Sequence, residues 1–246
     1  FKFWIVYFFF VIVYLGVLFG ISQSFVEEEY SLFTNSISQQ GSPEYNPSGF
    51  QLFNIGSIVF GILKLPLIWF FLLTYRILTR KIAIISTIFY MLGTIGFILI
   101  GIFPIYKHLL HAIAANLTFF GYFMALNIYL NLSFFRSIRS SSKWWRKVGW
   151  LSFIIIFNLG YFNMLISRYV IPVLFPFSPV LVKIMVFPLW EWFTFFSIVF
   201  GVFLLFFHIY RFFTTHPSKN ISYPQWVLKL KARYSTNGTI TDNRSR

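Results

Sequence analysis

Few ionisable side chains interrupt the long apolar segments of this chain, and each of them is a candidate functional group. Glu191, between two tryptophans, is the only acidic residue within such a segment. His111 and Arg168 lie near the ends of two others, and Lys64 lies inside a fourth. An ionisable group in hydrocarbon is costly, so it normally faces a partner or a polar cavity. These four side chains carry the first hypotheses about chemistry.

Three of them are predicted to lie at a similar depth. A helix rises about 1.5 Å per residue, which places His111, Arg168 and Glu191 within about two turns of one another if their helices are neighbours. Arg168 is then the best partner for Glu191, through a bidentate pair, and His111 is the second. Two interpretations stay open, a pocket for a polar headgroup or a proton and a structural ion pair between two helices. The other pocket candidates are His108, Asn158 and Glu44.

A metal site is a weaker interpretation of the histidines. His108 and His111 are three residues apart, so both can face one side of a helix. A zinc ion needs three or four protein ligands, and Glu191 would supply only the third. The chain has no cysteine, and no motif resembles a nucleophile elbow, a phosphate-binding loop or a zinc-protease helix. We therefore predict no catalytic residue, no metal and no cofactor.

Lys64 lies deep in an apolar segment, two residues before Pro66. A lysine at this depth needs water, a partner or a long reach to the membrane surface. Proline lacks a backbone donor and leaves a carbonyl free one turn earlier, so we expect a kink nearby. Transporters use such broken helices, but we find no inverted repeat in the two halves of this chain.

The elements that must position these side chains are transmembrane helices. Of the 246 residues, 58% are hydrophobic and 11% are charged, and the mean hydropathy is +0.74. Soluble domains are about 45–50% apolar and about 25% charged. A span needs about 20 apolar residues, and six segments qualify: 3–21, 50–75, 82–103, 109–135, 148–171 and 184–213. We predict an all-α polytopic membrane protein, with a six-helix bundle over residues 1–213 and a basic cytoplasmic tail over residues 214–246.

The basic residues predict the orientation of the bundle. Most of the 20 Lys and Arg residues fall on one side, in the connections after the second and fourth segments and in the tail. By the positive-inside rule, both termini are cytoplasmic. The acidic residues Glu27, Glu28, Glu29 and Glu44 fall on the other side, in the first outer loop.

Most of the net charge of +14 is therefore a topology signal and does not indicate nucleic-acid binding. The basic face is expected to attract anionic lipid headgroups. We expect a multi-pass protein of a prokaryotic plasma membrane, with an organelle membrane as an open alternative. The predicted membrane-surface residues are Lys143, Trp144, Trp145, Arg146, Lys147, Trp226 and Lys229.

The first outer loop, residues 22–49, is polar and rich in turn-forming residues. It is either a plain connector or a lid over an outward-facing cavity. Asn46 or Ser48 is placed to cap the start of the second segment. Pairs of small residues predict close helix packing; they are Ser57/Gly61, Gly121/Ala125 and Ser197/Gly201.

Several runs of residues resemble one family of membrane proteins. The runs at 30–38, 46–56, 95–97, 101–104 and 108–112 are similar to a six-helix archaeal and bacterial family known as domain of unknown function 998. Glu191 stands where that family is expected to carry its acid. The pattern departs at Gln39-Gln40, where a more compact turn is usual, and at Lys107, where an acid is usual.

The resemblance covers about residues 1–210 and implies a six-helix transmembrane fold. The family is in turn distantly similar to the eukaryotic autophagy-modulator and GPI-remodelling six-helix proteins. Those proteins also pair a Pro-Glu in the first outer loop, comparable to Pro43-Glu44 here, with a histidine-bearing helix. The relatives imply a lipid-related role by analogy alone.

Three functions follow as hypotheses. The first is binding or handling of a lipid or small amphiphile in a polar pocket of the outer leaflet. The second is an accessory subunit of a larger membrane complex, since the chain shows so little chemistry. The third is a proton-coupled transporter or intramembrane enzyme that uses Glu191 and His111.

Overall fold

The computed structural model describes residues 2–24, 26, 31, 33, 35–73, 80–140, 144–174 and 187–215. Every element in these ranges is helical, and six helices are long and apolar enough to cross a membrane. The predicted all-α fold with six transmembrane segments is confirmed. The orientation of the termini stays a prediction.

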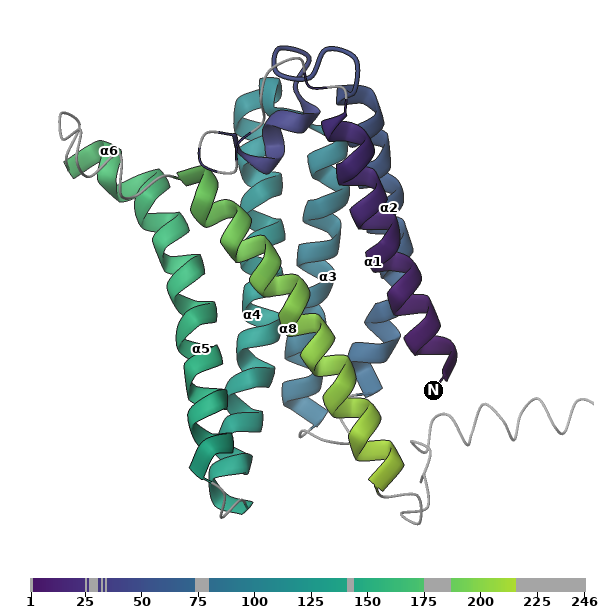
Figure 1. Ribbon diagram of the computed structural model, residues 1–246, viewed down its shortest axis with the longest axis vertical. Coiled ribbons are helices and arrows are strands. Elements are labelled where there is room, and N and C mark those ends of the chain that lie inside the picture. The colour runs from purple at the N-terminus through teal and green to yellow at the C-terminus, as the bar shows by residue number, and fades with distance from the viewer. Residues whose placement is uncertain are drawn as a thin grey trace, which may run out of the picture. The chain divides into compact units, whose positions relative to one another are not determined.

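The six long helices are arranged along the chain as expected (Figure 1). They are α1 (Lys2–Gln23), α2 (Phe50–Leu73), α3 (Arg80–Ile102), α4 (His108–Ser140), α5 (Trp144–Leu165) and α8 (Phe187–Thr215). Four short elements join or extend them: the 3-10 helices η1 (Ile37–Gly41) and η3 (Ile105–Lys107), the π-helix η4 (Ile166–Val170) and α6 (Ile171–Leu174). The chain divides into compact units at residues 1–209 and 210–246, and all contacts below lie within the first.

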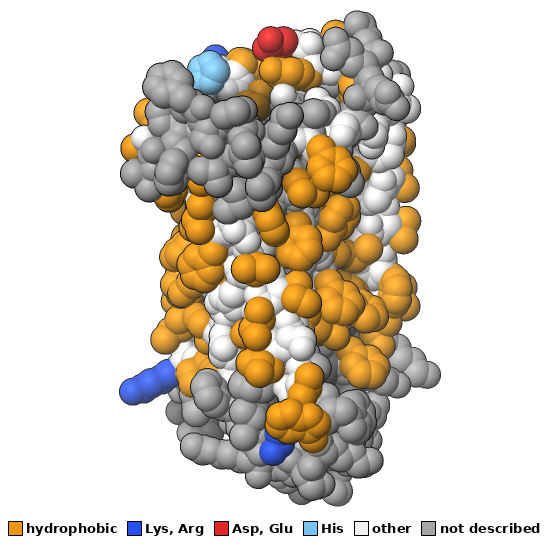
Figure 2. All heavy atoms as spheres, turned by 60° about the vertical axis from the view of Figure 1, so that its left-hand side comes forward, with side chains coloured by type: hydrophobic (Ala, Val, Ile, Leu, Met, Phe, Trp, Pro, Cys, Tyr) orange, Lys and Arg blue, Asp and Glu red, His pale blue; other side chains and the backbone are white. Residues whose placement is uncertain are grey.

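The end of the bundle that carries residues 35–49 and 103–107 is called the loop end below. Exposed charged or polar side chains lie at the loop end, in Glu44, Lys107 and His108. At the opposite end, Lys81 in the first turn of α3 is exposed and Lys147 in the first turn of α5 is partly exposed. Figure 2 shows an apolar face between charged side chains at the two ends. Exposed large side chains such as Ile155 on α5 cover this face, as a surface against lipid requires.

Helices α3 and α4 pack most closely, because glycines let their backbones meet. A Cβ on Gly121 would clash with the backbone of Gly93 and Phe89, and a Cβ on Gly96 would clash with the backbone of Thr118. A Cβ on Gly61 of α2 would clash first with the side chain of Ile98 of α3 and would lie 3.3 Å from its backbone nitrogen. The close packing predicted from the pairs Ser57/Gly61 and Gly121/Ala125 is therefore confirmed, as in membrane helices generally. A Cβ on Gly201 of the third pair would meet the side chain of Leu126 alone.

Aromatic rings fill the remaining contacts between helices. Phe71 of α2 stacks on Tyr90 of α3 with ring centroids 4.1 Å apart, and Phe123 of α4 stacks on Tyr161 of α5 at 3.9 Å. Offset and edge-to-face ring pairs are favourable beyond the area that they bury. Helix α2 continues through Pro66 to Leu73, so the proline does not end the helix beside Lys64.

Candidate functional site

Glu191 lies near the start of α8 and is 1% exposed, so its carboxylate is fully withdrawn from solvent and lipid. Its Oε2 accepts a hydrogen bond from the backbone N–H of Ile37 at 2.9 Å, and its Oε1 accepts one from the hydroxyl of Ser38 at 3.4 Å. Both donors belong to η1 in the loop. The partner of the buried acid is thus the loop, because a buried carboxylate is stable only where donors satisfy it.

Trp192, the residue after Glu191, forms a hydrogen bond to the same loop. The indole Nε1 of Trp192 donates to the backbone oxygen of Asn35 at 3.1 Å. The turn itself closes through Gln39, whose Oε1 accepts from the Ser36 N–H at 2.6 Å. This hydrogen bond gives Gln39 a defined role in the loop.

Asn46 ties the loop to two other segments. Its side chain is 0% exposed, and its Nδ2 donates to the backbone oxygens of Ser22 and Gln40, both at 3.0 Å. Its Oδ1 accepts from the Gly49 N–H at 3.0 Å, just before α2 begins. Of the two capping residues predicted, the structure gives this role to Asn46, while Ser48 is exposed.

The two histidines do not converge. His111 is 4% exposed, and its Nδ1 lies 2.8 Å from the backbone oxygen of Phe103, whereas His108 is exposed at the start of α4. The Nε2 of His111 has no hydrogen-bond partner among the described residues. Within the ranges that the structure describes, no group of three or more acidic or histidine side chains is placed to hold a metal ion.

Arg168 lies in the π-helix η4 and interacts electrostatically with both His111 and Glu191. Its guanidinium carbon lies 5.0 Å from the ring centroid of Phe187 and 5.6 Å from that of Tyr169. Among the described residues it forms no ion pair with Glu191. The three predicted pocket residues therefore share one region, but the direct bidentate pair is absent there.

Asn158 lies apart from this region. It is about 15 Å along the helix from Arg168 at 1.5 Å per residue. Its Oδ1 accepts from the Nδ2 of Asn127 at 2.9 Å, and its own Nδ2 donates to the Ile154 carbonyl at 2.8 Å. Asn131 also donates to the Asn127 side chain. This asparagine cluster joins α4 to α5.

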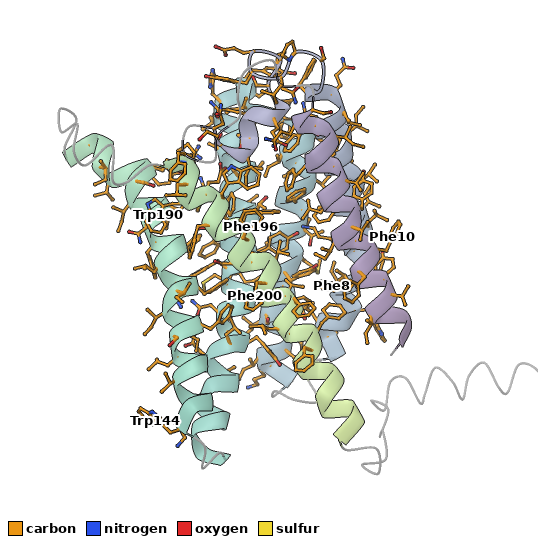
Figure 3. The ribbon with its side chains drawn as sticks, viewed as in Figure 1. Phe8, Phe10, Trp144, Trp190, Phe196 and Phe200 are labelled. Atoms are coloured by element: carbon orange, nitrogen blue, oxygen red, sulfur yellow. The ribbon has the colours of Figure 1, made fainter. Side chains whose placement is uncertain are left out.

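The remaining candidates lie at the surface or outside the described residues. Glu44 is exposed in the loop, and Trp144 is 75% exposed at the first residue of α5, where its side chain points away from the bundle (Figure 3). Lys147 is partly exposed one turn further on. Lys143, Trp226 and Lys229, and the side chains of Trp145 and Arg146, lie outside the described part. Their role at the membrane surface stays a prediction.

Lys64 occupies a site that the sequence did not reveal. It is 7% exposed, and its Nζ lies over three aromatic rings from three helices. The distances to the ring centroids are 4.5 Å for Phe60, 4.2 Å for Phe97 and 4.2 Å for Tyr122. These are cation–π distances, and such ring faces attract an ammonium group.

A cavity of about 50 Å³ lies beside this lysine. Its wall comes from α1, α2, α3, α4 and α8. Among the described residues that line it, Lys64 is the only ionisable one apart from two tyrosines, Tyr90 and Tyr122. Its other polar side chain, Thr118, already donates to the Ala114 carbonyl at 2.9 Å. The cavity is thus an apolar chamber with a single amine.

Aromatic side chains of α1 and α8 contact each other along one side of the chamber. Phe8 stacks on Phe206 with centroids 4.3 Å apart, and Phe19 meets Trp192 at 5.6 Å and Phe195 at 5.3 Å. Figure 3 shows Phe8 between α1 and α8, whereas Phe10 points outward from the same helix. The backbones of these two helices approach each other far less closely than those of α3 and α4.

Two aliphatic side chains of the wall lie between these ring contacts along α1 and α8. Ile12 of α1 and Val199 of α8 both line the cavity and are both partly exposed. We call this stretch of wall the α1/α8 seam. By contrast, α1 is held to α2 by hydrogen bonds from Tyr7 to the Leu63 carbonyl at 2.5 Å and from Tyr14 to the Gly56 carbonyl at 3.3 Å.

One signal in the sequence could have indicated part of this site. Phe60 precedes Lys64 by four residues and therefore lies one turn away on the same helix face. No spacing along the chain links that pair to Phe97 or Tyr122, which come from α3 and α4.

Comparison with known proteins gives one match. The family model described as "Protein of unknown function (DUF998)" matches residues 10–171, which is more than half of the chain, so the protein belongs to that family. The match includes Lys64 and His111 but ends before Glu191. No curated protein and no solved structure matches the chain.

Proposed function

We propose that this member of the DUF998 family binds a lipid or small amphiphile inside its helix bundle. The observation that carries the proposal is the chamber of about 50 Å³ beside Lys64, lined by five of the spanning helices. Membrane-protein interiors are normally packed as closely as other protein interiors, with few voids larger than a water molecule. A chamber that combines apolar walls with one convergent polar group is typical of ligand sites.

The size of the chamber limits what enters it. Sites that enclose a drug-sized ligand hold about 300–1,000 Å³, so this chamber takes only one end of a lipid-like molecule. The rest of the ligand then lies along the helix surface. An amphiphile suits this arrangement, because its polar end can reach Lys64 while its chain stays in the hydrocarbon.

The α1/α8 seam is the proposed path into the chamber. The side chains of Ile12 and Val199 both line the chamber there and are both partly exposed. Rotation of side chains requires no rupture of backbone hydrogen bonds, so the seam opens at lower cost than the tightly packed α3–α4 contact.

The polar pocket predicted at the loop end, around His111, Arg168 and Glu191, is a second candidate. The Nε2 of buried His111, which has no partner among the described residues, favours it. In that pocket, however, the carboxylate of Glu191 is already occupied by Ile37 and Ser38. A ligand would have to displace the loop to use this acid, which makes the chamber beside Lys64 the better site.

Native mass spectrometry of the protein extracted gently from its own membrane tests the proposal. We expect one reproducible lipid adduct per chain. Val199→Trp fills the seam and should remove the adduct, while Phe196→Trp, an exposed position on the same helix, should keep it. An adduct that persists in Val199→Trp places the ligand elsewhere, and the same spectra for His111→Ala then test the pocket at the loop end.

A further inference from the structure

We infer that the ligand's polar end is a carboxylate with a single negative charge, carried on one apolar chain and seated against Lys64. The inference rests on the proposed function, because it names the class of amphiphile that the same chamber holds. It starts from the surroundings of the Lys64 amine.

The three ring faces cover the Lys64 amine but offer it no oxygen or nitrogen acceptor for a hydrogen bond. Phe60, Phe97 and Tyr122 place ring faces 4.2–4.5 Å from Nζ. An ammonium group has three N–H donors, and none of them reaches an acceptor among the residues that the structure describes. The rings therefore orient the amine and leave its hydrogen-bonding capacity for a group in the chamber.

The described residues also supply no counter-charge. Glu191 is the only buried acid among them, and it is bonded to the loop. The described residues that line the cavity beside Lys64 include no acidic side chain. An uncompensated charge in the membrane interior is unfavourable, and a ligand with one acidic group supplies the counter-charge that Lys64 lacks.

The single charge of Lys64 and the small volume of the chamber both favour a carboxylate. One lysine neutralises one negative charge, and a phosphate monoester would leave a second charge unpaired in the hydrocarbon. A phosphodiester carries a single charge, but it is flanked by two esterified groups, which a chamber of about 50 Å³ does not admit. A fatty acid or an isoprenoid acid presents a small planar head and one chain.

The test compares acids with their alcohols on the full chain in lipid nanodiscs. The probes are palmitic acid and phytanic acid, each paired with the alcohol of the same chain. We expect the wild-type protein to bind either acid at least tenfold more tightly than its alcohol. Lys64→Met should abolish this preference and keep the affinity for the alcohols, while Lys81→Met, exposed at the start of α3, should behave as wild type.

The outcomes separate the inference from the proposed function. Equal binding of acid and alcohol by the wild-type protein, or a preference that survives in Lys64→Met, overturns the carboxylate inference alone. If the wild-type protein binds neither the acids nor their alcohols, the proposed function is wrong and the inference falls with it. If Lys64→Met does not fold, infrared spectra of ¹³C-carboxyl palmitate on the wild-type protein decide, because an ionised carboxylate band supports the inference and a protonated band contradicts it.

Discussion

The carboxylate of Glu191 accepts a hydrogen bond from the backbone N–H of Ile37, at 2.9 Å, across 154 positions of the chain. This contact joins the last described spanning helix to the first loop. Trp192, the next residue, bonds the backbone of Asn35 in the same loop. The only acid buried among the described residues therefore anchors a loop that would otherwise connect α1 and α2 alone.

Removal of this anchor should loosen the loop. A hydrogen bond to a charged group contributes about 1.5–3 kcal/mol, so Glu191→Ala should destabilise the protein by about that much. Glu191→Gln keeps one acceptor oxygen and should lose less. Hydrogen exchange of residues 35–42 measures the effect, and we expect the faster exchange in Glu191→Ala.

The control for this prediction is Glu44→Gln, because Glu44 is an exposed acid in the same loop. Its exchange should match the wild type. If Glu191→Ala leaves the exchange of residues 35–42 unchanged but abolishes lipid binding, the acid serves a ligand and not the loop.

Asn46 is the second anchor, and its substitution should be as damaging as that of many core residues. Asn46→Ala removes three hydrogen bonds and leaves the Ser22 and Gln40 carbonyls buried without this donor. Each buried group left unpaired costs about 1–3 kcal/mol. The midpoint of thermal unfolding, followed by tryptophan fluorescence in detergent, should fall clearly below that of the wild type.

Ser48→Ala provides the comparison, since Ser48 is exposed two residues away. Its midpoint should not change. A similar midpoint for both variants would mean that water replaces the bonds of Asn46 at no cost.

Gly121 should tolerate no side chain at all. In Gly121→Ala, the new methyl group meets the backbone of Gly93 and Phe89, which cannot rotate away. Overpacking of this kind typically costs about 1–3 kcal/mol. The free energy of unfolding, measured in mixed detergent, should fall by that amount.

Gly16→Ala is the matched substitution, because a Cβ at Gly16 meets nothing within 4 Å. Alanine is favoured over glycine within a helix by about 0.5–1 kcal/mol. We therefore expect Gly16→Ala to leave stability unchanged or to raise it slightly. An equal loss of stability in both variants would mean that the loss in Gly121→Ala does not come from the close α3–α4 contact.

The asparagine pair between α4 and α5 should contribute modestly to the free energy of unfolding. Hydrogen bonds between membrane helices average about 0.6 kcal/mol and reach about 1.7 kcal/mol in double-mutant cycles. A cycle of Asn127→Leu and Asn158→Leu should give a coupling energy in this range, since the Nδ2 of Asn127 lies 2.9 Å from the Oδ1 of Asn158.

The same cycle distinguishes the two interpretations of Asn158, a residue of the ligand pocket or a structural contact between α4 and α5. A coupling energy near zero, together with altered lipid binding in Asn158→Leu alone, would restore Asn158 to the ligand pocket. A coupling within the expected range and unchanged binding would make it a structural contact.

The amino-acid sequence determined which segments cross the membrane and which family the chain resembles. Segment length and hydropathy are local properties, and the six described helices follow the six predicted segments. Pairs of small residues such as Gly121/Ala125 also indicate close packing locally, because only a small residue lets two backbones meet.

Only the tertiary structure decided the partners of the polar groups. The sequence predicted that Arg168 and His111 share a depth with Glu191, but the acid bonds to Ile37 and Ser38 of the loop. Depth along one helix does not specify which face turns toward which neighbour. A loop residue, moreover, carries no periodicity from which its position can be calculated.

The surroundings of Lys64 could not be predicted for a related reason. Phe60, Phe97 and Tyr122 come from three helices and are only three among many aromatic residues in the chain. In a soluble protein, polarity would distinguish the inward face of each helix from the outward one. In a membrane, lipid is as apolar as the protein core, so the sequence fixes the helices, and packing alone decides which rings surround the lysine.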